Sequence, residues 1–184
     1  MEQAFAVTRN VLENVQPNQM DDSTPCQSWK VRDLVSHIVG GSQWFGSSMD
    51  AGGTDDGGDN MPDVSTQDYL AIFDDGAKKA VEAFGRDGAA EKIVKLPFGE
   101  FPGAAFMGLA TTDTFTHAWD LAKATGQNTD LNPQLAAQIL EGAKASIPDQ
   151  FRGEDGKMPF GPQLDAPAGA STADQLAAFL GRKI

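Results

Sequence analysis

Apolar residues recur every three or four positions through several segments of this chain, a spacing typical of amphipathic helices. The pattern predicts a first helix over residues 1–15, closed by Pro17, and a second over residues 28–47. The second segment has the denser apolar stripe, formed by Val31, Leu34, Val35, Ile38 and Val39. Residues 50–64 are rich in glycine and aspartate, which predicts an exposed, mobile loop. Calcium binding there is an alternative, but the loop lacks EF-hand spacing.

A third helix is predicted between residues 65 and 85. Ser65 and Asp68 can both cap its N-terminus, because their side chains accept hydrogen bonds from free backbone N–H groups. Gly85 is the residue at which this helix is expected to end. Its apolar stripe consists of Tyr69, Ile72, Phe73, Ala77, Ala80, Val81 and Phe84. Residues 92–106 hold short β-prone pieces around Pro97-Phe98-Gly99, which predict an extended connection or a small hairpin.

The second half of the chain predicts three further helices. The first begins near Pro102 and reaches Thr125, before Gly126. The next lies between Asn132-Pro133 and Pro148. A short closing helix over residues 174–180, capped by Ser171 and Asp174, follows an irregular stretch at residues 149–170. Long helices with little strand signal favour an all-α fold, and we expect four of them to form a bundle within one domain, residues 1–184.

The charge and the residue composition of the chain disfavour some classes of binding partner and some kinds of metal site. The net charge of −12 and the pI near 4.4 disfavour nucleic acid and anionic lipid as partners. Glu2 stands where a signal peptide would be basic, and no apolar run approaches membrane-spanning length, so we expect a cytoplasmic protein. The single cysteine, Cys26, rules out a disulfide within one chain, so any metal must rely on histidine and carboxylate.

The only two histidines each follow an aspartate by four residues: Asp33/His37 and Asp113/His117. On a helix, residues at this spacing are neighbours, with Cβ atoms about 5–6 Å apart, and can share a divalent ion. The common alternative is a surface hydrogen bond. If the two predicted helices pack together, three side chains could bind a metal and leave positions open, as in catalytic sites. Imidazole and carboxylate favour zinc, with nickel, iron or manganese as alternatives.

Two longer blocks resemble a known family. They are TPCQSWKVRDLVSH, from Thr24 to His37, and DTFTHAWDLAKATG, from Asp113 to Gly126. Both are similar to the DinB-like superfamily, and within it to the actinobacterial branch that includes the metal-binding domain of mycothiol-dependent maleylpyruvate isomerase. Pro97-Phe98-Gly99 and Leu180-Gly181-Arg182 also resemble that branch.

The resemblance implies a DinB-like four-helix bundle, here with additional short C-terminal helices and a small extended connection. It also implies a divalent metal held by His37, Asp113 and His117, with Asp33 a non-ligand near the start of its helix. The isomerase has glutamate at the position of Asp113, which is one methylene shorter. The isomerase also carries a further C-terminal domain, for which this sequence has no room, so its isomerase activity is not carried over.

Other residues have two interpretations each. Asp120 either orients a metal ligand as a hydrogen-bond acceptor or makes a local cap or ion pair. Cys26, just before a helix, is either an activated thiol or a small buried residue, and the second is favoured. Lys30 and Arg32 either neutralise an anionic thiol cofactor or lie on the solvated helix surface. The tryptophans are expected in the core or in a pocket wall: Trp29, Trp44 and Trp119.

The functional hypothesis is therefore a metal-dependent enzyme that uses a low-molecular-weight thiol, such as mycothiol, for transfer or isomerisation of an electrophilic substrate. A metal-dependent hydrolase is one alternative, and a non-enzymatic metal-binding or stress protein is another. A homodimer is a reasonable arrangement for such a bundle.

Overall fold

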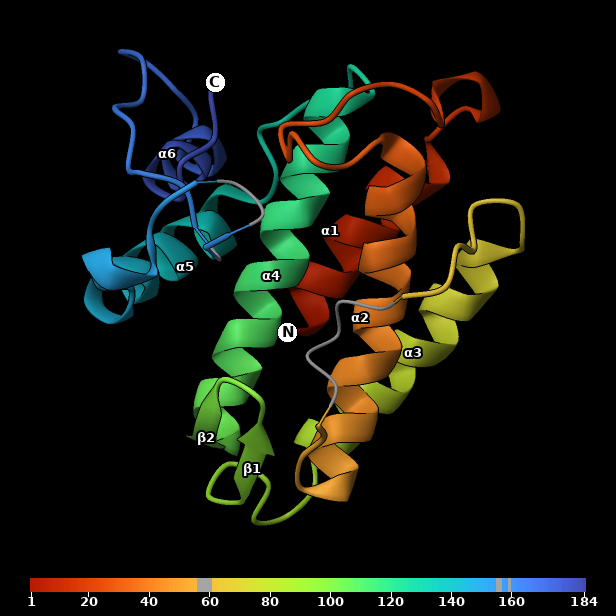
Figure 1. Ribbon diagram of the computed structural model, residues 1–184, viewed down its shortest axis with the longest axis vertical. Coiled ribbons are helices and arrows are strands. Elements are labelled where there is room, and N and C mark those ends of the chain that lie inside the picture. Colours follow the sequence, from red (N-terminus) through yellow and green to blue (C-terminus); the bar gives the residue numbers. More distant parts are fainter. Residues whose placement is uncertain (56–60, 155–156, 159) are drawn as a thin grey trace.

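The computed structural model describes residues 1–55, 61–154, 157–158 and 160–184. These residues form a mostly helical structure with one small hairpin, which confirms the all-α prediction (Figure 1). The elements are α1 (Glu2–Glu13), η1 (Pro17–Gln19), α2 (Val31–Ala51), α3 (Tyr69–Phe84), β1 (Ile93–Leu96), β2 (Gly99–Pro102), α4 (Gly103–Ala124), α5 (Pro133–Ser146), η2 (Asp149–Phe151) and α6 (Thr172–Phe179). None of the helices in these described ranges is long and apolar enough to cross a membrane.

Helices α1 to α4 form the predicted bundle. Helix α2 packs against α3 and α4, and α1 packs against α4 and α3, so each helix has two neighbours. The antiparallel hairpin β1–β2 connects α3 to α4 at one end of the bundle (Figure 1). Helices α5 and α6 pack together beside α4, where a second apolar cluster includes Phe115, Trp119 and Leu176.

Two glycines let α2 and α3 approach each other closely. A Cβ atom on Gly46 would lie 2.9 Å from the backbone nitrogen of Ala80, and one on Gly76 would lie 2.9 Å from that of Gln43. Real Cβ atoms do not come so near a backbone atom, so neither position has room for a side chain. The absence of side chains at these points therefore sets the distance between the two helices.

The second helix is longer than its predicted end at residue 47. It continues to Ala51 because Ser48 and Met49 are buried. The Lys92 ammonium also donates to the carbonyls of Met49 and Asp50, at 2.6 and 2.9 Å, and thereby satisfies acceptors that a helix end leaves free.

The loop predicted over residues 50–64 is corrected at both ends. Its first two residues belong to α2, and Val64 is buried, with its backbone N–H donating to Ser36 Oγ at 3.1 Å. Residues 56–60, the middle of that prediction, lie outside the described part of the chain.

The capping predictions are confirmed at α5 and α6, and the predicted cap formed by Ser65 followed by Asp68 is corrected at α3. Asp68, and not Ser65, is the N-cap of α3, because its carboxylate accepts a hydrogen bond from the backbone of Ala71 at 3.1 Å. Asn132 caps α5, and Ser171 caps α6 by accepting from Asp174 N–H. The stretch at residues 149–170 is irregular where described, apart from η2.

Replacing Gly46 by alanine tests the close contact of α2 with α3. We expect Gly46→Ala to lower the free energy of unfolding by about 1–3 kcal/mol, because the added methyl group pushes the backbone of α3 away. The control is Gly108→Ala in α4, where a Cβ atom meets nothing within 4 Å. That change should raise stability by about 0.5–1 kcal/mol. Urea unfolding of both variants measures the difference, and equal stabilities would contradict the packing described.

Candidate metal centre

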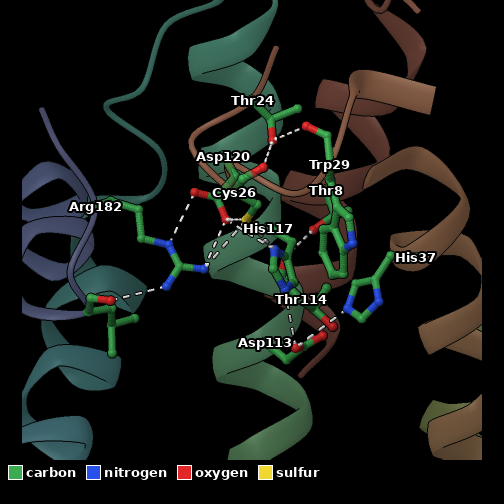
Figure 2. A network of polar contacts seen from close by, with 11 residues as sticks. Thr8, Thr24, Cys26, Trp29, His37, Asp113, Thr114, His117, Asp120 and Arg182 are labelled. Atoms are coloured by element: carbon green, nitrogen blue, oxygen red, sulfur yellow. Dashed lines mark hydrogen bonds and ion pairs between the residues drawn. The ribbon is translucent and has the colours of Figure 1, made fainter. Parts of the chain in front are cut away.

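Helices α2 and α4 bring together the three residues proposed from the resemblance. His37 projects from α2, while Asp113 and His117 project from successive turns of α4 (Figure 2). The Nε2 atom of His37 lies 3.8 Å from Asp113 Oδ1, and the Nε2 atom of His117 lies 3.5 Å from the same oxygen. One ligand atom from each residue lies within 4.8 Å of the other two, so the group could hold a metal ion.

The distances in this group fit ligands of a shared ion better than hydrogen-bonded partners. Both exceed the usual 2.7–3.2 Å of a hydrogen bond from nitrogen to oxygen. Zinc with bonds of about 2.0–2.2 Å in tetrahedral geometry holds its ligand atoms about 3.4 Å apart. The Nε2 atom of His37 is also buried without a hydrogen-bond partner in the described part of the chain. Two imidazole nitrogens and one carboxylate oxygen are therefore arranged as a metal site requires.

The electrostatics of the group favour a positive charge. Burial alone would raise the pKa of the Asp113 carboxyl, but the charge of His117 and the contacts with both imidazoles lower it well below its usual range. Burial alone would lower the pKa of His117, but Asp113 and Asp120 raise it well above its ordinary value. An imidazole between two carboxylates thus lies where a cation, either a proton or a metal ion, is stabilised.

Asp120 contacts the side of His117 that faces away from Asp113. Its Oδ2 atom lies 3.0 Å from His117 Nδ1, and the residue has no exposed surface. Burial would raise the pKa of Asp120, but the Arg182 guanidinium and His117 lower it to about 2. A carboxylate on the second ring nitrogen is the usual way in which proteins orient a metal-binding histidine. The contact with His117 Nδ1 is the one that Asp120 needs in order to orient a metal ligand, which is the first of its two interpretations.

Cys26 lies behind this carboxylate, in a turn held by Thr24. The Thr24 hydroxyl lies within hydrogen-bond distance of the carbonyls of Cys26 and Trp29, at 2.8 and 2.9 Å, and can donate to either one. Cys26 is buried, and its Sγ atom lies 3.3 Å from Asp120 Oδ2. Burial raises the pKa of the Cys26 thiol, so the thiol stays protonated and donates to Asp120. The interpretation as a small buried residue therefore fits, and the activated nucleophile does not.

Trp29 forms one wall of the group. Its ring centroid lies 4.5 Å from that of His37 and 5.5 Å from that of His117. The side chain of Asp113 remains 37% exposed, so the group is open to solvent on that side. The other tryptophans lie elsewhere: Trp119 is buried and donates to Asp174, and Trp44 packs against Phe106.

The comparisons with known proteins show the family of this chain. The family described as the mycothiol maleylpyruvate isomerase N-terminal domain matches residues 1–122. This chain belongs to that family. Proteins from two strains of Mycobacterium tuberculosis, each described as uncharacterized, are 43% identical over 185 residues, covering 98% of this chain and 93% of each relative. No solved structure gives a significant match.

The region matched by the mycothiol maleylpyruvate isomerase N-terminal domain family contains both D-x-x-x-H pairs. Of the two, only Asp113 and His117 lie close enough together to bind one ion as a pair. The Asp33 carboxylate accepts a hydrogen bond from the backbone of Lys30 at 2.9 Å and caps α2, as expected for a non-ligand. Lys30 and Arg32 pair with Asp21 on the surface, which agrees with their interpretation as solvated residues.

Arg182 is the residue that the sequence did not reveal. It follows α6, outside the region matched by the family, and its guanidinium contacts both carboxylate oxygens of Asp120. In the sequence, Leu180-Gly181-Arg182 contributes to the family resemblance, and a basic residue after a glycine at a helix end suggests an interaction with the helix terminus, but neither assigns Arg182 to the metal site. No spacing links it to a residue 62 positions earlier.

Cys26 allows a direct test of this arrangement, because it is the only cysteine. A buried thiol with a raised pKa reacts poorly, so we expect the native protein to react with a chromogenic disulfide reagent more than about tenfold slower than the unfolded protein does. Absorbance of the released aromatic thiolate measures both rates, with the urea-unfolded chain as the control. A native rate equal to the unfolded rate would show that Cys26 is accessible and activated.

Proposed function

We propose that this protein is a metal-dependent enzyme that binds a divalent ion through His37, Asp113 and His117 and uses a low-molecular-weight thiol of the mycothiol type. The observation that carries the proposal is the convergence of these three side chains, at distances suited to a shared ion. Membership in a family named after a mycothiol-dependent isomerase supports the choice of thiol. The reaction proposed is transfer or isomerisation of an electrophilic small molecule, with the thiol as nucleophile.

Each residue of the group has a defined part in this proposal. His37 and His117 offer neutral nitrogens, and Asp113 offers one negative charge, a set that favours zinc and also accepts nickel, iron or manganese. An ion in this place would lower the pKa of a thiol bound beside it, so that the thiol reacts as a thiolate. Trp29 covers one side of both imidazoles, and the exposed side of Asp113 leaves a path for the thiol.

The two D-x-x-x-H pairs provide a matched test of metal binding. We expect the purified protein to bind one zinc ion per chain, and His37→Ala, Asp113→Ala and His117→Ala each to lose it, because two remaining ligands hold zinc weakly. Asp33→Ala is the control: it also removes a carboxylate four residues from a histidine, but one that only caps α2. Elemental analysis after dialysis measures the zinc content per chain. Retention of zinc by His117→Ala, or its loss from Asp33→Ala, would refute this ligand set.

The thiol is tested by calorimetric titration of mycothiol into the zinc-loaded protein. We expect mycothiol to bind at least about tenfold more tightly than its S-methyl derivative, a difference of about 1.4 kcal/mol, because a thioether cannot become a thiolate. The metal-free protein is the control and should not distinguish the two. Equal affinities for the zinc-loaded protein would remove the thiol from the proposal. Thiol-independent ester or amide hydrolysis would then indicate a hydrolase, and inertness a non-enzymatic metal-binding protein.

A further inference from the structure

The guanidinium of Arg182 forms a two-pronged ion pair with the buried carboxylate beside the candidate metal centre. Its Nε atom lies 3.2 Å from Asp120 Oδ1, and its Nη2 atom lies 3.1 Å from Asp120 Oδ2 (Figure 2). The same Oδ2 atom contacts His117 Nδ1 at 3.0 Å and Cys26 Sγ at 3.3 Å. Both oxygens of Asp120 are thus occupied by donors, and the forked geometry fixes the plane of the carboxylate.

The backbone after α6 is shaped to deliver this arginine. Gly181 has a φ of 90°, in the left-handed region that favours glycine, and a Cβ atom there would lie 2.5 Å from the Cα atom of Gly161. The N–H of Arg182 returns to the carbonyl of Ala177 at 2.9 Å, which closes the end of α6. Its Nη1 atom also donates to the carbonyl of Leu180 at 3.1 Å. The direction of the side chain is therefore set by the backbone on both sides of Gly181.

Asp120 needs such a partner because it is fully buried. A buried carboxylate is costly unless a cation and hydrogen bonds compensate it. Once Arg182 holds Asp120 in place, the Asp120 carboxylate can accept a hydrogen bond from the Nδ1–H of His117. An ion bound at the other ring nitrogen, Nε2, which faces Asp113 and His37, would take the place of the proton on that nitrogen.

We infer that Arg182 is a positioning residue of the metal centre: by anchoring Asp120, it fixes the ring orientation and the tautomer of His117. This inference rests on the proposed function, since it concerns the same metal site. The segment after α6 is accordingly part of the centre, although it lies outside the residues matched by the family.

A second metal ion is the competing interpretation of the same atoms, because Cys26, His117 and Asp120 also lie within 4.8 Å of one another. The guanidinium already contacts both Asp120 oxygens and lies 3.9 Å from the Cys26 sulfur. It therefore places a positive charge directly beside two of the three side chains that such an ion would need. This group therefore supports the first site and is not a second one.

The test compares two arginines that anchor the same segment. We expect Arg182→Ala to weaken zinc binding by about 10–100-fold, the usual effect of removing an outer partner of a metal ligand. Arg152→Ala is the matched control. Arg152 donates to the carbonyl of Phe179 at 2.7 Å and covers its ring, but among the described residues it makes no hydrogen bond or ion pair with Asp120 or His117. Competition with a chromogenic zinc chelator measures the affinities, and circular dichroism confirms folding.

The ring nitrogens of His117 provide a readout that a purely structural role would not change. In ¹⁵N spectra of the zinc-loaded wild type we expect an Nδ1–H imidazole bound through Nε2, and in Arg182→Ala a mixture of tautomers. The chain has only two histidines, so His37→Ala assigns the His117 signals of the metal-free protein, and a zinc titration of the wild type follows them into the bound form. If Arg182→Ala does not fold, Arg182→Lys replaces it, because lysine keeps the charge but cannot form the fork. It should also weaken zinc binding and mix the tautomers.

The outcomes separate this inference from the proposed function. If the folded Arg182 variant bound zinc as tightly as the wild type and its His117 signals were unchanged, the inference would be overturned. Zinc loss in His117→Ala would still support the proposed ligand set in that case. An equal loss of affinity in Arg152→Ala would also overturn it, because the effect would then be general loosening of the segment. Failure of the wild type to bind zinc would instead refute the proposed function itself.

Discussion

The packing of α2 beside α4 is the constraint on which the candidate centre depends. Within α4, helical spacing alone brings Asp113 and His117 together, but His37 arrives only if α2 lies at the right distance and rotation. The positions of α2 and α4 are in turn set by their contacts with the other helices of the bundle. Gly46 and Gly76 let α3 approach the far side of α2, and Thr8 of α1 contacts the carbonyl of Thr114 at 3.2 Å, next to Asp113. The bundle therefore defines the centre more than any local motif does.

The charged groups of the centre form one alternating row. From α2 to the segment after α6, bases and acids follow each other in the order His37, Asp113, His117, Asp120 and Arg182. Each carboxylate lies between two nitrogen bases, so both the partly exposed Asp113 and the fully buried Asp120 have a base on either side. In such a row the members depend on one another, because removing one leaves its neighbour buried without a partner. The neighbouring Cys26 remains a neutral thiol mainly because burial raises its pKa, an effect that the Asp120 carboxylate strengthens and that His117 and Arg182 oppose.

The predictions from sequence were accurate where one periodic signal dominated. The helices and the hairpin follow from apolar spacing and from glycine and proline, and Asp33 was correctly identified as a helix-start residue from the resemblance. The end of α2 and the burial of Val64 were missed, because they depend on tertiary contacts such as that of Lys92 with the carbonyls of α2.

Spacing alone could not choose between the two D-x-x-x-H pairs, and that choice came from the resemblance. Metal binding itself remains a prediction. Arg182 was missed as a site residue because its contact with Asp120 joins distant segments without any repeated pattern.

The sequence separation of these contacts has a consequence for how the protein acquires its structure. The Arg182 guanidinium and the Cys26 sulfur meet across 156 residues, and Arg182 and Asp120 across 62. Contacts between such distant segments form late in folding, because the entropy of closing a long loop is lost before they can stabilise anything. A nascent chain that has emerged only as far as α4 therefore has the Asp113/His117 pair but not the row that orients it. The row of side chains that lines the candidate centre is therefore complete only after α6 has docked.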